Sequence, residues 1–302
     1  MAQEIKTSPA AGSAGAAKPR IIDFRVRPST PEMVSVAQGH GPFRDMLSRK
    51  AKPYDQRVYP VEELVQEMDA AGIEVAVTQG RDLETTFNWK VTNDHVAEIA
   101  GKFPGRFVPF AGVDPNKGMD AVRELARAVR DLGMRGCSLD PYMHRAPADD
   151  RIYFPIYAKC VELDIPVILT AGPGAFVRQS VMADASPAAI DVVARHFPEL
   201  TIIASHGCYP YVLEMISVAL RHENVYFEFS GYELFPGAEN YVKAANTVIP
   251  KKVLFGSAHP LTNFNDTIAR HAGLDYTPEA RENVYYNNGR RLLERHGFRF
   301  PA

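Results

Sequence analysis

The chain has 302 residues, of which 46% are hydrophobic and 23% charged, and its formal net charge is -2. This composition is typical of a globular domain, and so small a net charge argues against nucleic-acid binding. The three cysteines are widely spaced and odd in number, which predicts neither a disulfide framework nor a metal clip. Such cysteines suit a reducing compartment, so we expect a cytoplasmic protein. The apolar runs are too short for a membrane span, and the N-terminus lacks the apolar core of a signal peptide.

The first part of the chain divides into an arm, a strand and an insertion. Residues 1–20 are small, polar and proline-containing, which predicts a flexible N-terminal arm. Residues 21–28 form an apolar strand that ends in a charged, proline-stopped segment. The segment 29–60 is far longer than a usual connection, so we interpret it as a lid or an oligomer contact. Residues 21–302 are predicted to be one domain.

From residue 61 onward, predicted helices and strands alternate. The later strands are predicted at 74–78, 107–113, 135–140, 166–170, 200–205, 225–229 and 252–256. The helices are predicted at 61–71, 88–102, 119–132, 156–163, 187–197, 212–220, 241–248, 264–272 and 279–295. Eight strands alternating with helices predict a (β/α)8 TIM barrel, a fold that typically needs about 250 residues.

Reactive groups of such a barrel lie at the carboxyl ends of its strands. Read in chain order, these ends carry Arg25 and Arg27, Gln79 with Arg81, Asp114, Asp140, Thr170, His206, Glu228 with Ser230, and Ala258 with His259. Two residues apart on a strand, Arg25 and Arg27 share one face. They predict a cradle for a carboxylate, completed by Asp140 and Thr170, unless Asp140 and Glu228 simply neutralise the two cations.

Four segments together resemble one family. Ile21 to Pro28, Pro166 to Gly172, Ser205 to Pro210 and Leu254 to Pro260 are similar to the amidohydrolase-related family that includes aminocarboxymuconate-semialdehyde decarboxylase-like proteins. The resemblance implies an amidohydrolase-type barrel, with a metal held by a His-x-His pair on strand 1, a histidine on each of strands 5 and 6, and an aspartate on strand 8. Those places hold Arg25 and Arg27, Thr170, His206 and Ala258.

Only one of the five implied metal-site positions therefore keeps its residue type. Arginine cannot coordinate a cation, so we expect no cofactor in this chain. A remnant metal site from His206, Asp140 and either His144 or His259 stays open.

His206 and His259 are the candidate catalytic acids or bases. His259 is the replacement for the missing carboxylate of strand 8, provided that the strand has already turned into its loop. Cys208 lacks a triad and is predicted to be a buried thiol.

Two functions fit these observations. In the first, the chain is the companion subunit of a metal-bearing amidohydrolase-like paralogue, as the resemblance to the two-chain 2-aminoisobutyric acid hydroxylase component implies. The partner would then carry a dinuclear centre of the non-haem monooxygenase type. In the second, the chain is a metal-independent hydrolase or decarboxylase of a small carboxylate, bound by Arg25 and Arg27. Whether this chain is itself catalytic stays open at this point.

Overall fold

The computed structural model describes residues 18–34, 57–172 and 181–300. Most of the predicted arm at 1–20, and 35–56 of the predicted insertion, lie outside these described residues. Among the helices that are described, none combines the length and apolar character needed to cross a membrane.

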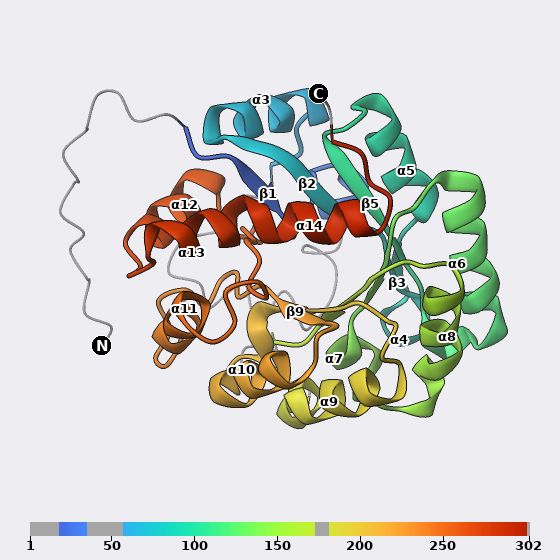
Figure 1. The fold of residues 1–302 in the computed structure, drawn as a ribbon. Coiled ribbons are helices and arrows are strands. Elements are labelled where there is room, and N and C mark those ends of the chain that lie inside the picture. Colours follow the sequence, from blue (N-terminus) through green and yellow to red (C-terminus); the bar gives the residue numbers. More distant parts are fainter. Residues whose placement is uncertain (1–17, 35–56, 173–180, 301–302) are drawn as a thin grey trace, which may run out of the picture.

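A curled sheet of parallel strands forms the centre of the molecule (Figure 1). Its order is β1 (Ile21–Asp23), β2 (Ile73–Gln79), β5 (Phe107–Gly112), β6 (Cys137–Leu139), β7 (Val167–Thr170), β8 (Ile202–Ser205) and β9 (Val225–Phe227). The segment 252–256 closes the ring. Leu254 N donates to Phe227 O at 2.8 Å, and Phe24 N donates to Phe255 O at 2.9 Å. The predicted TIM barrel is confirmed.

Helices surround the strands (Figure 1). They are α3 (Val61–Ala71), α5 (Asn93–Lys102), α6 (Met119–Leu132), α8 (Phe154–Glu162), α9 (Pro187–His196), α10 (Val212–Arg221), α11 (Glu239–Asn246), α12 (Phe264–Ala272), α13 (Pro278–Glu282) and α14 (Asn288–Arg295), with the short α4 (Glu84–Phe87) and α7 (Pro141–His144). The predictions for α3, α6 and α12 match residue for residue. In α6 the stop is Gly133, whose φ of 70° suits a residue without a side chain.

The predicted eighth strand is not a regular strand, and the reason is Asp23. Its carboxylate oxygen Oδ1 accepts hydrogen bonds from Arg25 N at 2.9 Å and from Ser257 N at 3.0 Å. The backbone N–H of Ser257 is thereby bonded to a side chain and not to the backbone of the first strand segment. The two segments still meet once more, at a bridge between Val26 and His259.

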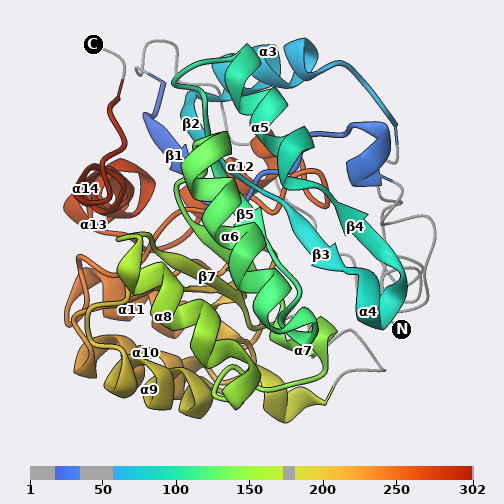
Figure 2. The same cartoon turned by 90° about the vertical axis from the view of Figure 1, so that its right-hand side faces the viewer.

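The predicted helix at 88–102 begins too early. In the structure, β3 (Arg81–Leu83) pairs with β4 (Trp89–Val91) as an antiparallel hairpin, and α5 starts only at Asn93. Thr92 caps that helix, because its hydroxyl accepts from His95 N at 3.2 Å. Figure 2 shows the hairpin and α4 extending together at one side of the barrel.

The C-terminal helices cover the base of the barrel, at the amino ends of the strands. The predicted helix 279–295 contains a π-helical turn, Asn283–Asn287, between α13 and α14. Figure 1 shows α14 lying across the strands. Gly289 permits this approach, since a Cβ there would lie 2.7 Å from Phe24 Cε2. The apolar interior is thereby sealed at this end.

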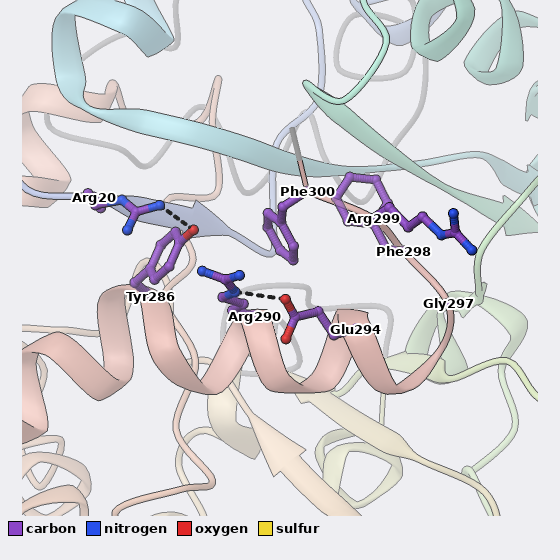
Figure 3. Close-up of a pocket in the computed structure, with 8 residues that line it drawn as sticks. All are labelled: Arg20, Tyr286, Arg290, Glu294, Gly297, Phe298, Arg299 and Phe300. Atoms are coloured by element: carbon purple, nitrogen blue, oxygen red, sulfur yellow. Dashed lines mark hydrogen bonds and ion pairs between the residues drawn. The ribbon is translucent and has the colours of Figure 1, made fainter. Parts of the chain in front are cut away.

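A cavity of about 540 Å³ opens beside α14 at the base (Figure 3). Its arginines are largely engaged: Arg20 binds Glu74 and the Tyr286 hydroxyl, and Arg290 binds Glu294 at 2.8 Å. The Arg20 contacts attach the residue before β1 to β2 and to the π-helical turn that precedes α14, so we interpret this end as structural.

Candidate functional site

The first strand delivers Arg25 into the barrel mouth. Arg25 is 2% exposed, and its Nη1 donates to Ser205 Oγ at 2.6 Å and to Thr170 Oγ1 at 3.4 Å. Thr170 and Ser205 end β7 and β8, so the guanidinium crosses to the opposite side of the barrel. Two of the predicted anion-site residues, Arg25 and Thr170, are brought together.

Arg27 follows two residues later and has a different environment. Its Nη2 atom is buried and has no hydrogen-bond partner among the described residues. Burial, reinforced by the positive charges of Arg81 and Arg25, holds the pKa of Arg27 well below its usual range. A cation so placed has an unfulfilled requirement for an acceptor.

Asp140 was predicted to lie against Arg25 and Arg27, the arginine pair of strand 1, but in the structure its carboxylate has a different partner. Arg81 of β3 takes both carboxylate oxygens in a bidentate pair, with Nε to Oδ2 and Nη2 to Oδ1 both at 2.7 Å. Burial alone would raise the pKa of Asp140, but the charges of Arg81 and Arg27 outweigh it and lower that pKa. Arg81 is therefore the counter-ion, and it belongs to the hairpin that the sequence patterns did not reveal.

Glu228, just past β9, organises a second polar group. Its Oε1 accepts the Ser205 hydroxyl hydrogen and the His206 backbone N–H at 3.0 Å. Its Oε2 accepts the Ser230 backbone N–H at 2.7 Å. Glu228 was predicted only as a possible neutralising charge. In the structure it reaches Arg25 through Ser205, without a direct ion pair.

His206 directly follows β8, and its imidazole is hydrogen-bonded on one side. Nδ1 is 2.8 Å from the Ser230 carbonyl oxygen and 3.2 Å from Ser230 Oγ. Burial, and then the charge of Arg25, lower the pKa of His206 to about 3, so the ring is neutral near pH 7. Nε2 makes no hydrogen bond to any described residue.

The other two histidines of the prediction lie in packed surroundings. His259 Nε2 is 2.8 Å from the Tyr59 hydroxyl, and its ring stacks on Phe264 with centroids 4.3 Å apart. Ala258, before it, has φ of 58°, so the chain has left extended geometry there. His144 Nδ1 is 3.2 Å from the Tyr153 hydroxyl, and its Nε2 is 3.3 Å from Asp82 O.

The donor set does not fit the metal that the family resemblance implies. Arg25 and Arg27 occupy the two strand-1 ligand positions, and guanidinium groups do not coordinate cations. Within residues 18–34, 57–172 and 181–300, no group of three His, Cys, Asp or Glu side chains is placed to hold a metal. The suggested remnant of His206, Asp140 and His144 is thus not assembled there.

Three features of the mouth were not assigned from the sequence. One is the Arg81–Asp140 pair. Another is Tyr142, a buried residue of α7 whose pKa burial raises to about 12, with Arg81 and Asp140 close by. The third is Asp23, whose Oδ2 is buried without a partner among the described residues. Cys208, by contrast, is the predicted buried free thiol, and burial raises its pKa.

Comparison with known proteins agrees with this architecture. Residues 22–295 match the amidohydrolase family. The chain is 28% identical over 244 residues to a 2-keto-4-carboxy-3-hexenedioate hydratase of Sphingobium sp. (strain NBRC 103272 / SYK-6), covering 67% of this chain and 70% of that one. It is 27% identical over 77 residues to the 2-amino-3-carboxymuconate-6-semialdehyde decarboxylase of Dictyostelium discoideum, covering 26% of this chain and 21% of that one.

A solved structure matches over nearly the whole chain. It is an uncharacterized TIM-barrel protein, Bb4693, from Bordetella bronchiseptica, with 30% identity and a TM-score of 0.79. The similarity covers 92% of this chain and 100% of that chain. The family match and this likeness confirm the predicted resemblance, and this chain belongs to the amidohydrolase family.

Proposed function

We propose that this protein is a metal-independent lyase, a decarboxylase or hydratase, that binds a small carboxylate in the barrel mouth. The observation that carries the proposal is the buried Arg27 Nη2, which has no hydrogen-bond partner among the described residues. Arg81 already has Asp140, and Arg25 is held by Ser205 and Thr170. A carboxylate entering from solvent would give Arg27 the bidentate acceptor that a guanidinium fits best.

The charges around the mouth are consistent with an anionic ligand. Arg25, Arg27 and Arg81 are cations, whereas Asp140 and Glu228 are carboxylates whose pKa values are lowered in this environment despite burial. Arg81 is paired with Asp140, and Arg25 is linked to Glu228 through Ser205. Arg27 is therefore the cation of this group that has no acceptor among the described residues. A buried charge without a partner is costly, and the attraction between opposite charges is stronger away from water. Binding of one carboxylate group would therefore be favoured.

The relatives' names agree with a carboxylated substrate. The Sphingobium protein is named as a hydratase of a keto-carboxy-hexenedioate, and the Dictyostelium protein as a decarboxylase of an amino-carboxymuconate semialdehyde. Neither name describes a monooxygenase component. We therefore favour the lyase over a companion subunit paired with a dimetal partner, which remains the alternative and would reveal itself by co-purification of a second, His-x-His-containing barrel.

The proposed reactions require the chain's own residues to stabilise negative charge and to transfer a proton. In decarboxylation, the bond from carbon to the carboxylate breaks, carbon dioxide leaves, and the electron pair stays on carbon. Arg27 would stabilise that pair once it is delocalised on to a neighbouring oxygen of the substrate. The Tyr142 hydroxyl is protonated at neutral pH and can supply the replacing proton, while neutral His206 can accept one in the hydration direction.

The test is an activity screen on chelator-treated protein. Unsaturated 2-oxo dicarboxylates and hydroxybenzoates would be supplied, and carbon dioxide release and ultraviolet absorbance followed. We expect turnover of at least one compound to survive chelation and to fall at least about tenfold in Arg27→Ala, a loss of ~1.4 kcal/mol in transition-state binding. Arg135→Ala, which removes an exposed arginine at the opposite end of the strands, is the matched control. Turnover that disappears with the metal, or that ignores Arg27, would reject the proposal.

A further inference from the structure

We infer that Glu228 is a positioning residue that orients both the anion-binding Arg25 and the imidazole of His206. Its catalytic meaning rests on the proposed function, but the two orientations can be measured without a substrate. The inference starts from the number of donors that converge on one carboxylate. Glu228 is 1% exposed and accepts from the Ser205 hydroxyl, the His206 N–H and the Ser230 N–H.

The first orientation runs through Ser205. A hydroxyl has a single hydrogen, and Ser205 gives it to Glu228 Oε1. The lone pairs of Ser205 Oγ are then directed at Arg25, whose Nη1 donates to that oxygen at 2.6 Å. Ser205 is 1% exposed, so without the carboxylate its hydroxyl hydrogen could turn toward the guanidinium, and two donors would face each other. Glu228 therefore makes Ser205 an acceptor.

The second orientation concerns the tautomer of His206. A carbonyl oxygen can only accept, so the contact of 2.8 Å between His206 Nδ1 and Ser230 O requires the hydrogen to be on Nδ1. The lone pair is then on Nε2, the nitrogen that has no partner among the described residues. Glu228 fixes both ends of this arrangement, because it holds the backbone N–H of His206 and that of Ser230.

The carboxylate has little freedom to leave this position. A Cβ built on Gly256 would lie 2.6 Å from Glu228 Oε2, so the chain passes directly behind the carboxylate. The network therefore behaves as a rigid support. Such outer partners of active-site groups typically change affinity or activity by about 10–100-fold when they are removed from metal sites, and we expect a comparable size here.

The test compares Glu228→Gln with Glu233→Gln. The amide that Glu228→Gln introduces has one donating end, which must face at least one N–H or O–H donor, whereas both oxygens of the native carboxylate accept. Glu233 is a matched control, since it is buried in the same loop and accepts from Gly231 N at 2.8 Å, outside the network of Ser205 and His206.

The primary measurement is the nitrogen-15 NMR signature of His206 in ligand-free protein, assigned by its loss in His206→Asn. We expect the Nδ1-protonated tautomer in the wild type and in Glu233→Gln, and a mixture of tautomers in Glu228→Gln. In addition, calorimetric titration with succinate should show about a tenfold weaker Kd in Glu228→Gln. An unchanged tautomer together with an unchanged Kd would overturn the inference.

A second variant keeps the inference testable if Glu228→Gln does not fold. Ser205→Ala removes the link to Arg25 alone, so succinate affinity should fall severalfold while the His206 tautomer stays as in the wild type. Unaltered affinity in Ser205→Ala would overturn the arginine half. If the wild type binds no carboxylate yet the tautomer changes in Glu228→Gln, the proposed function fails and the positioning of His206 stands.

Discussion

Asp23 offers a prediction whose size can be worked from the structure. Its side chain is 0% exposed, and burial raises its pKa from 3.8 to about 6, although hydrogen bonds from Ser257 and Arg25 oppose the shift. Because the folded-state pKa lies above the unfolded value, the folded protein binds more protons between these two values. The free energy of unfolding contributed by Asp23 therefore falls as the pH rises through that window.

Replacing Asp23 with Asn should remove this penalty. A shift of roughly two pKa units corresponds to ~3 kcal/mol near neutral pH. The amide oxygen can still accept from Arg25 N and Ser257 N, but its NH2 group takes the place of Oδ2, which has no partner among the described residues. That unpaired donor costs about 1 kcal/mol. We therefore expect Asp23→Asn to be more stable by about 2 kcal/mol near pH 7.5, and to have no advantage near pH 4.

The assay is urea unfolding followed by fluorescence of Trp89, the single tryptophan of the chain, across the range from about pH 4 to pH 8. Asp131→Asn, which removes a carboxylate from an exposed position of α6, is the matched control. If Asp23→Asn were less stable than the wild type at every pH, the carboxylate would be a stabilising charge and the reasoning would be wrong.

Two other predictions concern the packing around the site. Burial lowers the pKa of His271 to about 3, and neither ring nitrogen has a hydrogen-bond partner among the described residues. The unfolded histidine gains a proton between pH 7 and pH 5 while the folded one stays neutral, so the free energy of unfolding should fall by ~2 kcal/mol over that range. His271→Phe should abolish that part of the acid sensitivity in urea unfolding, and an unchanged pH profile would count against it. Gly256→Ala should destabilise by about 1–3 kcal/mol, since its methyl group meets the Glu228 carboxylate. Gly101→Ala, with open space around its Cβ in α5, should stabilise by about 0.5–1 kcal/mol, and equal effects of the two changes on the thermal midpoint would refute this account.

The barrel was predictable from the sequence because its signals are local and repeated. Hydrophobic periodicity and glycine stops define α3 and α6 to the residue, and β-branched runs define β2 and β7. The eighth strand segment was located correctly, but its irregular ladder was not foreseen. That irregularity depends on a long-range contact between Asp23 and Ser257, which no local pattern carries.

The site was predictable as a set of positions but not as a set of partners. Their positions at the strand ends identify four candidate site residues, and all four lie at the mouth of the barrel: Arg25, Thr170, Asp140 and His206. The cation that pairs with Asp140 is Arg81, which lies in a short hairpin. The second strand of that hairpin, Trp89 to Val91, falls within the segment that was predicted to be a helix. A charge count at the strand ends gives no sign that one arginine would lack a carboxylate, because the carboxylates there are as many as the arginines. Only the structure shows that Asp114 binds Thr85 and Asn116 and is not a partner of Arg27.

The measurement that tests the central claim most directly is calorimetric titration of EDTA-treated protein with succinate and 2-oxoglutarate. The account predicts binding at one site per chain, weakened at least about tenfold by Arg27→Ala and unchanged by Arg135→Ala, where tenfold corresponds to ~1.4 kcal/mol. Equal affinity in the wild type and Arg27→Ala, or binding that appears only after a divalent metal is restored, would contradict it.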